Sequence, residues 1–211
     1  MGVIVVDLFV TLDGVYQSPG SRDEDTEGGF PFGGWQGAYT DAESDATIGA
    51  SIERIDALLL GRKTYDIWAA FWPFQPAGDP IAAKFAAVPK FVASHSLTAP
   101  SWPGTTVVTD VAAEVRGIRD RFGETHVFGS GDLVRTLLRE DLVDRINLWL
   151  YPIALGTGKR LFAEGTVPAA FALVEPPVAF PKGSVQLVYE RAGEPVTGID
   201  MSTIDASKAE A

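Results

Sequence analysis

The chain has 211 residues, contains no cysteine and carries a formal net charge of −11. Its length fits one domain with a substantial core. The absence of cysteine excludes disulfides and thiolate catalysis. The negative net charge opposes binding to nucleic acid or to an anionic membrane surface. We expect a cytoplasmic globular domain over residues 1–192, followed by a polar tail over 193–211.

The first ten residues are apolar and predict a buried strand that is too short to cross a bilayer. Asp7 lies inside this strand and Asp13 lies at its exit. Burying a carboxylate is costly unless the group is hydrogen-bonded or neutral, and a neutral acid donates a proton. Asp7 is therefore a candidate catalytic acid or a carboxylate satisfied by its neighbours. Asp13 is a second candidate, or a turn former before Gly14.

Residues 14–39 contain glycines, acidic residues and aromatics but little periodicity. A loop of this length inside one domain is usually functional or disordered. Because it follows the first strand directly, we expect it to fold over the end of the sheet as a lid, with glycine pairs at 28–29 and 33–34 as hinges. The alternative is a floppy insertion.

A helix over 41–54, a strand over 57–60 and a helix that begins at Lys63 are predicted next. Residues 61–64, Gly-Arg-Lys-Thr, place two cations and a hydroxyl beside the free N–H groups of a helix start. Cations are disfavoured at a helix N-terminus, so the pattern favours a bound anion over two merely solvated charges.

A strand over 90–94 ends in Ser94, His95 and Ser96. Their hydroxyl and imidazole groups would join the same crevice as residues 61–64 if both strand ends lie on one edge, as ligand sites in open α/β sheets do. The two histidines of the chain are far apart and lack a third ligand, so the sequence predicts no zinc site.

A strand over 125–128 leads into a small turn, Gly129-Ser130-Gly131, which precedes an amphipathic helix. The glycines allow a backbone to approach an anion closely, and the first helical turn offers unpaired N–H groups and the positive end of the helix dipole. This pattern predicts a phosphate cradle for a nucleotide.

Three better-known glycine patterns do not fit. The turn lacks the third glycine of a dinucleotide fingerprint, and Ser130 lacks the glycine two residues upstream that a serine-hydrolase nucleophile elbow requires. In LGTGKR, residues 155–160, Arg160 replaces the Ser or Thr that would hold magnesium, which excludes a phosphate-loop kinase or ATPase.

The last predicted strands cover 144–151, 170–174 and 184–190, with three prolines between the second and the third. We expect them to form an antiparallel edge on a mixed, mostly parallel sheet. The elements not yet mentioned are a strand over 105–109 and a helix over 110–121, capped by Asp110.

Five segments, taken in order, carry a family resemblance: VTLDG at 10–14, LLLGRKTYDIW at 58–68, FVASHSL at 91–97, VFGSGDLVRTLL at 127–138 and LVDRINLWLYPIALGTGKRLF at 142–162. Together they resemble the dihydrofolate reductase-like superfamily, in the branch of the reductase domain of the bacterial bifunctional riboflavin-biosynthesis deaminase-reductase. The resemblance covers about residues 2–190 and implies a dihydrofolate reductase-like three-layer α/β fold with antiparallel C-terminal edge strands.

Members of this superfamily use NADPH, and the resemblance implies that Arg62 contacts its 2′-phosphate. It also implies a cis peptide bond between Gly129 and Ser130, although a non-proline cis bond costs about 3 kcal/mol. The implied cofactor-binding residues are Gly61, Arg62, Lys63, Thr64, Ser94, His95, Ser96, Gly129, Ser130, Gly131, Asp132 and Leu133.

The resemblance implies hydride transfer to a C=N or C=O group of a small heterocycle, pterin- or pyrimidine-like. The riboflavin enzyme has a basic residue, used for a phosphorylated ribosyl substrate, where this chain has Asp7, so we do not expect that substrate here. Two alternatives are a non-catalytic nucleotide-binding module and a flavin in the same cleft. Relatives commonly pair through their sheets, which implies a homodimer with residues 146–151 as a contact.

Overall fold

The computed structural model describes residues 1–162 and 164–200. The strands are β1 Val3–Thr11, β2 Ala57–Gly61, β3 Lys90–Ala93, β4 Thr105–Val108, β5 Glu124–Phe128, β6 Arg145–Tyr151, β7 Phe171–Leu173, β8 Val178–Ala179 and β9 Val185–Arg191. The helices are α1 Ala42–Glu53, α2 Arg62–Ala69, α3 Pro80–Ala87, α4 Val111–Arg121 and α5 Gly131–Arg139, with short 3-10 helices η1 Glu27–Gly29, η2 Trp35–Tyr39 and η3 Trp72–Phe74.

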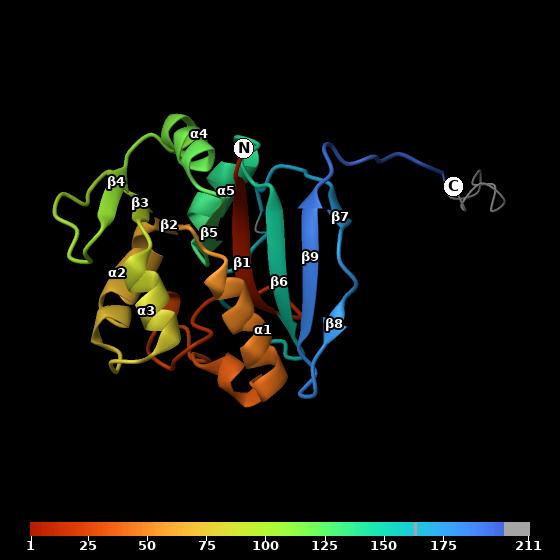
Figure 1. Cartoon of the computed structure of the whole chain (residues 1–211). Helices are drawn as coiled ribbons and strands as arrows, with labels where there is room; N and C mark the ends of the chain where they lie inside the picture. Colours follow the sequence, from red (N-terminus) through yellow and green to blue (C-terminus); the bar gives the residue numbers. More distant parts are fainter. Residues whose placement is uncertain (163, 201–211) are drawn as a thin grey trace.

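The described strands form one sheet in the order β4-β3-β2-β5-β1-β6-β9-β7, and β8 also pairs with β9 (Figure 1). Pairs from β4 to β6 are parallel, whereas β9 runs antiparallel to β6, β7 and β8. The expected mixed, mostly parallel sheet with antiparallel C-terminal edge strands is therefore confirmed.

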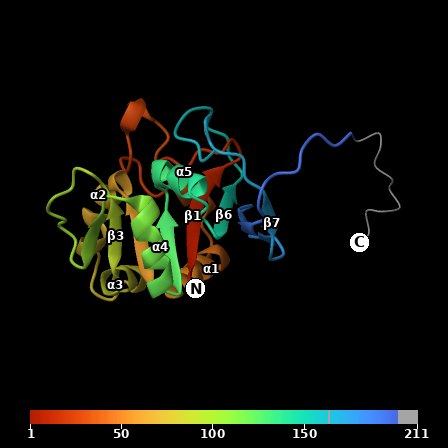
Figure 2. The same ribbon diagram turned by 90° about the horizontal axis from the view of Figure 1, so that it is seen from above.

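The parallel part of the sheet is buried on both faces, which explains its continuous apolar strands. Along β2, Ala57 and Leu59 face a core formed with α4 and α5, while Leu58 and Leu60 face a second core formed with α1, α2 and α3. The two helical layers flank the sheet in Figures 1 and 2. All parallel strands consequently deliver their carboxyl ends to one edge, where the connecting loops meet.

A third core joins the lid, residues 14–39, to β6 and the following loops. The Trp35 ring packs edge-on against Tyr151 with centroids 5.4 Å apart, and its Nε1 donates to the Gln17 carbonyl at 2.9 Å. Val15 and Phe30 are buried in the same cluster. The lid is therefore seated on the sheet by an apolar anchor, which contradicts the alternative of a floppy insertion.

Most expected elements are present, and the helix over 41–54 begins with a capping box in which Asp41 accepts from the Ser44 N–H. The sequence reasoning missed α3, which starts after the N-cap Asp79, and the two-residue strand β8. Of the expected tail, residues 193–200 contain no helix or strand, and 201–211 lie outside the described residues. Within the described ranges, no helix is long and apolar enough to cross a membrane.

Candidate functional site

A cavity of about 1240 Å³ lies at the carboxyl edge of the parallel strands. It brings together the strand ends that the sequence singled out, because β2, β3 and β5 run in parallel and are neighbours in the sheet. Of the twelve expected cofactor-binding residues, eleven line this cavity. The exception is Ser96, whose Oγ lies 3.5 Å from Arg62 Nη1 at its margin.

Ser130 connects the two glycine turns that start α2 and α5. Its Oγ accepts from the Gly61 N–H at 2.9 Å and donates to Thr64 Oγ1 at 3.0 Å. A Cβ on Gly61 would lie only 3.2 Å from the Ser130 Cβ, so a larger residue there would require Ser130 to shift by a few tenths of an ångström. The two phosphate-cradle turns thus form one continuous surface.

The expected cis bond between Gly129 and Ser130 is wrong, since no described peptide bond is cis. Gly129 and Ser130 both have φ near 53°, in the left-handed region. Two consecutive left-handed residues reverse the chain into α5 with ordinary trans geometry, at a cost of about 1–2 kcal/mol for the non-glycine Ser130.

The hydroxyl of Tyr16, a lid residue, lies at the start of α5. A Cβ on Gly131 would lie 2.2 Å from Tyr16 Oη, so only glycine leaves room for the ring. Burial raises the pKa of Tyr16, while Lys159 and the Gly131 N–H oppose that shift. Tyr16 is therefore a neutral hydroxyl that can both accept from α5 and donate to an anion bound there.

Every cation that lines the cavity is paired with a carboxylate of the same chain. Arg62 Nε lies 2.8 Å from Asp66 and Lys159 Nζ lies 2.6 Å from Asp25. Arg135 and Arg160 also form hydrogen-bonded ion pairs, whereas Lys63 Nζ lies 3.8 Å from Asp25. An anionic ligand must therefore compete with these internal carboxylates. The pairs are Arg62–Asp66, Arg135–Asp132, Arg160–Asp13, and Lys63 and Lys159 with Asp25 and Glu27.

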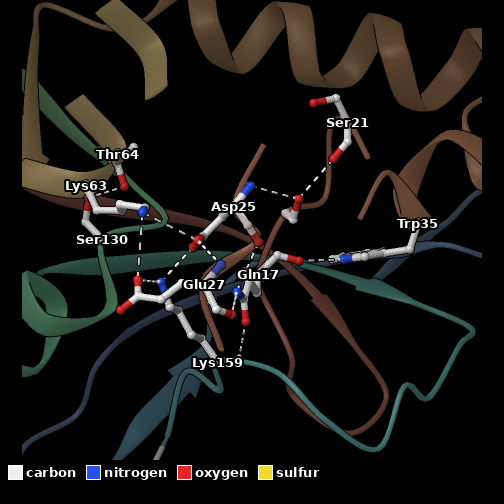
Figure 3. A network of polar contacts seen from close by, with 10 residues as sticks. Gln17, Ser21, Asp25, Glu27, Trp35, Lys63, Thr64, Ser130 and Lys159 are labelled. Carbon is white, nitrogen blue, oxygen red and sulfur yellow. Dashed lines mark hydrogen bonds and ion pairs between the residues drawn. The ribbon is translucent and has the colours of Figure 1, made fainter. Parts of the chain in front are cut away.

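The last four residues form a cluster that we call the latch, because it fastens the lid across the cavity (Figure 3). Lys159 Nζ donates to Asp25 at 2.6 Å and to Glu27 at 2.7 Å, and Lys63 Nζ lies 3.8 Å from Asp25. Burial opposes the charged form of Lys159, but its bonds to the two carboxylates outweigh burial and raise its pKa. The lid is thus joined to the loop after β6 and to α2.

Gln17 orders the backbone around the latch (Figure 3). Its Nε2 donates to the carbonyls of Asp25 and Glu27 at 3.1 and 3.0 Å, and its Oε1 accepts from the Lys159 N–H at 3.0 Å. The buried amide of Gln17 therefore satisfies backbone groups of the lid and of the loop after β6. These bonds fix the position of the lid against that loop. The expectation that residues 14–39 lie over the end of the sheet is confirmed, since several of them line the cavity.

The profile of the RibD C-terminal domain family matches residues 3–178. The chain belongs to this family. As a member, it is 26% identical over 194 residues to YyaP of Bacillus subtilis, a protein without a characterised function, and the match covers 90% of this chain and 95% of YyaP. The family resemblance expected from the sequence is confirmed.

Two solved structures share the fold of this RibD C-terminal domain. A protein of Shewanella sp. PV-4 assigned to riboflavin biosynthesis aligns with a TM-score of 0.69 at 24% identity, covering 90% of this chain and 98% of that one. A pyrimidine reductase-like protein of Corynebacterium diphtheriae aligns with a TM-score of 0.59 at 11% identity, covering 90% and 92%. The second similarity extends to architecture rather than to sequence.

Asp7 is buried within the RibD-type sheet and does not line the cavity. Its Oδ2 lies 2.6 Å from His126 Nδ1, and its Oδ1 accepts from Asn147 Nδ2 at 2.9 Å. Burial lowers the pKa of His126, but the charges and hydrogen bonds of Asp7 and Glu124 together outweigh burial and raise it. The buried polar groups of Asp7, His126 and Asn147 therefore satisfy one another inside the sheet. This agrees with the alternative that Asp7 is a carboxylate satisfied by its neighbours.

Asp13 holds a turn instead of facing the cavity. It accepts from Thr11 Oγ1 at 2.6 Å and from the Gly156 N–H at 2.8 Å, and the Thr11 hydroxyl, with further backbone donors, lowers the pKa of this carboxyl. It also pairs with Arg160 at 3.2 Å. These contacts join the end of β1 to the loop after β6 and keep Asp13 ionised.

Sequence reasoning missed the carboxyl of Glu24, which lines the cavity from the lid. Its Oε2 accepts from the Gly20 N–H at 2.7 Å and from the Ser21 N–H at 3.3 Å. Burial raises the pKa of Glu24 although these backbone donors oppose the shift. The run of acidic residues at 23–25 was visible in the sequence, but its direction toward the cavity depends on the lid fold.

Proposed function

We propose that this protein is an NADPH-dependent oxidoreductase that transfers a hydride to a C=N or C=O group of a small, pterin- or pyrimidine-like heterocycle. The observation that carries the proposal is the joined pair of glycine turns, held through Ser130, at one end of a cavity with room for two ligands. Membership of the RibD C-terminal domain family and a fold shared with a pyrimidine reductase-like protein support it.

The residues at the α5 end of the cavity fit a dinucleotide's pyrophosphate. The N–H groups of the first turn at Asp132 and Leu133 give fixed donors. The hydroxyls of Thr64 and Tyr16 stand beside them, and Tyr16 accepts from the Gly131 N–H. We assign the adenosine end to Ser94 and His95 and the 2′-phosphate to Arg62. NADPH would supply the hydride, and the chain supplies position and charge.

The proton for the reduction requires a separate donor, and we assign it to Glu24. A carboxyl with a raised pKa retains its proton closer to neutral pH, where general acid catalysis is useful. Asp7 and Asp13, the candidates from sequence, are bound in structural contacts outside the cavity. Trp68 and Phe9 add aromatic wall against which a flat heterocycle packs.

We also propose a homodimer that uses one face of the sheet. Both edges of β6 are already paired, with β1 and β9, so this strand can meet a second copy only through its side chains. Leu148, Leu150 and Leu187 are half-buried on the face toward α5 and form a short apolar stripe. Sedimentation as a dimer is expected, and a monomer at micromolar concentration contradicts this assignment.

Calorimetric titration with NADPH tests the main proposal. We expect micromolar affinity, a loss of at least tenfold in Arg62→Ala, and no change in Arg116→Ala, which removes an arginine from the exposed face of α4. Absence of NADPH binding refutes the proposal. Binding without NADPH oxidation across a panel of pterins and pyrimidines indicates a non-catalytic module, and a yellow purified protein indicates a flavin.

A further inference from the structure

Arg62, the first residue of α2, pairs with Asp66 one turn further along the helix, and both side chains line the cavity. Arg62 Nε lies 2.8 Å from both carboxylate oxygens of Asp66, and both side chains remain partly exposed, at 39% and 48%. The pair is therefore accessible to a ligand rather than sealed in the core. Asp66 thus accepts from Nε of Arg62, whereas Nη1 of the same guanidinium contacts Ser96.

The Nη side of Arg62 points to the end of β3. Nη1 lies 3.5 Å from the Ser96 Oγ, which adds a hydroxyl beside the guanidinium. Lys63, the next cation in the chain, is engaged by the latch at 3.8 Å from Asp25 and so turns away from this end. Of these two cations, Arg62 is the one that contacts Ser96, and Asp66 is the carboxylate paired with it.

A carboxylate and a guanidinium at this position favour different nucleotides. Arginine binds a 2′-phosphate, whereas an acidic side chain accepts hydrogen bonds from a free ribose hydroxyl and repels a phosphate. We propose that Asp66 sets the preference between the phosphorylated and unphosphorylated nicotinamide cofactors. It orients Arg62 for the phosphate and, through its own charge, keeps NADH as a weaker second ligand. This inference rests on the proposed NADPH site.

Asp66→Asn separates the two effects, because an amide oxygen still accepts from Arg62 Nε while the negative charge is lost. A unit charge about 5 Å from a doubly charged phosphate at an exposed site corresponds to roughly a fivefold to tenfold change in affinity. We expect Asp66→Asn to bind NADPH about fivefold more tightly and NADH no more tightly than the parent. Arg62→Ala should reduce the preference for NADPH to near unity.

Calorimetry with NADPH and with NADH, on the full chain and on each variant, tests the inference. Asp120→Asn, on the exposed side of α4, is the matched control for loss of one charge and should leave both affinities unchanged. An unchanged NADPH-to-NADH ratio in Asp66→Asn overturns the inference and leaves the proposed function standing. Failure of the parent protein to bind either nucleotide overturns both.

Discussion

The latch predicts that burial, rather than distance, decides how strongly each carboxylate holds the lid. Asp25→Asn and Glu27→Gln each remove one negative charge at nearly constant shape. Lys159 Nζ lies 2.6 Å from the Asp25 carboxylate and 2.7 Å from that of Glu27, so the two contacts are almost equal in length. The side chain of Asp25 is only 10% exposed, however, whereas that of Glu27 is 61% exposed.

The expected magnitudes follow from this difference in solvation. A hydrogen bond to a charged group in a buried setting contributes about 1.5–3 kcal/mol, whereas an exposed ion pair contributes about 0–1 kcal/mol. We therefore expect Asp25→Asn to lower the free energy of lid opening by about 2 kcal/mol, which corresponds to about a 30-fold increase in the open population. Glu27→Gln should increase the open population far less, because water screens its exposed carboxylate.

Hydrogen exchange measured by mass spectrometry on peptides from residues 16–36 reports this opening directly. Backbone bonds such as Gly34 N–H to the Ser18 carbonyl, 2.8 Å long, provide the protected amides. Asp23→Asn, an exposed lid carboxylate outside the latch, is the control and should exchange like the parent. Equal effects of the Asp25 and Glu27 variants, or a larger effect at Glu27, would show that burial does not decide the strength of these contacts.

Three further outcomes are expected. Gly131→Ala should weaken NADPH binding more than tenfold, because its Cβ would lie 2.2 Å from Tyr16 Oη. Gly37→Ala is the control and should leave the affinity unchanged, because the space around that Cβ is open. Equal affinities of the two variants in calorimetry would contradict the prediction. Lys90→Met should lower the free energy of unfolding in urea by about 3 kcal/mol, because Lys90 Nζ is buried and donates to the carbonyls of Phe85 and Val88 at 2.7 and 2.8 Å. The hydrogen bond and charge of Lys159 lower the pKa of Glu27 from its ordinary 4.5, so the contribution of Glu27 to lid closure is complete above pH 4.5 and is lost as the pH falls through the lowered value. Hydrogen exchange of the lid, corrected for intrinsic rates, should therefore rise in that acidic range. A flat profile would count against the latch.

The phosphate cradles were predictable because their signals are local. A glycine at a tight turn and the first residues of a helix sit within a few positions of each other, and backbone chemistry alone gives them an anion preference. The mostly parallel character of the sheet was predictable for a related reason, since uninterrupted apolar runs such as 57–60 indicate strands buried on both faces. Because parallel strands have their carboxyl ends at the same edge of a sheet, the strand ends before residues 61–64, 94–96 and 129–131 were expected to meet there.

The latch and the role of Asp7 were not predictable in this way. Lys159 and Asp25 are 134 positions apart, and His126 lies 119 positions from Asp7, so neither pairing leaves a trace in a single sequence. Without knowledge of its partners, Asp7 was a candidate catalytic acid as well as a satisfied carboxylate. Its contacts with His126 and Asn147 support the second interpretation. The prediction of a cis peptide bond was wrong, because the left-handed conformation of Ser130 reverses the chain while the peptide bond stays trans.

A crystal structure of the NADPH complex would show whether the two glycine turns hold a dinucleotide. We expect pyrophosphate density within hydrogen-bond distance of the Asp132 and Leu133 N–H groups, with the 2′-phosphate beside Arg62 and the nicotinamide directed toward the lid. Nucleotide density away from the α2 and α5 turns, or an empty cavity at saturating NADPH, would contradict it.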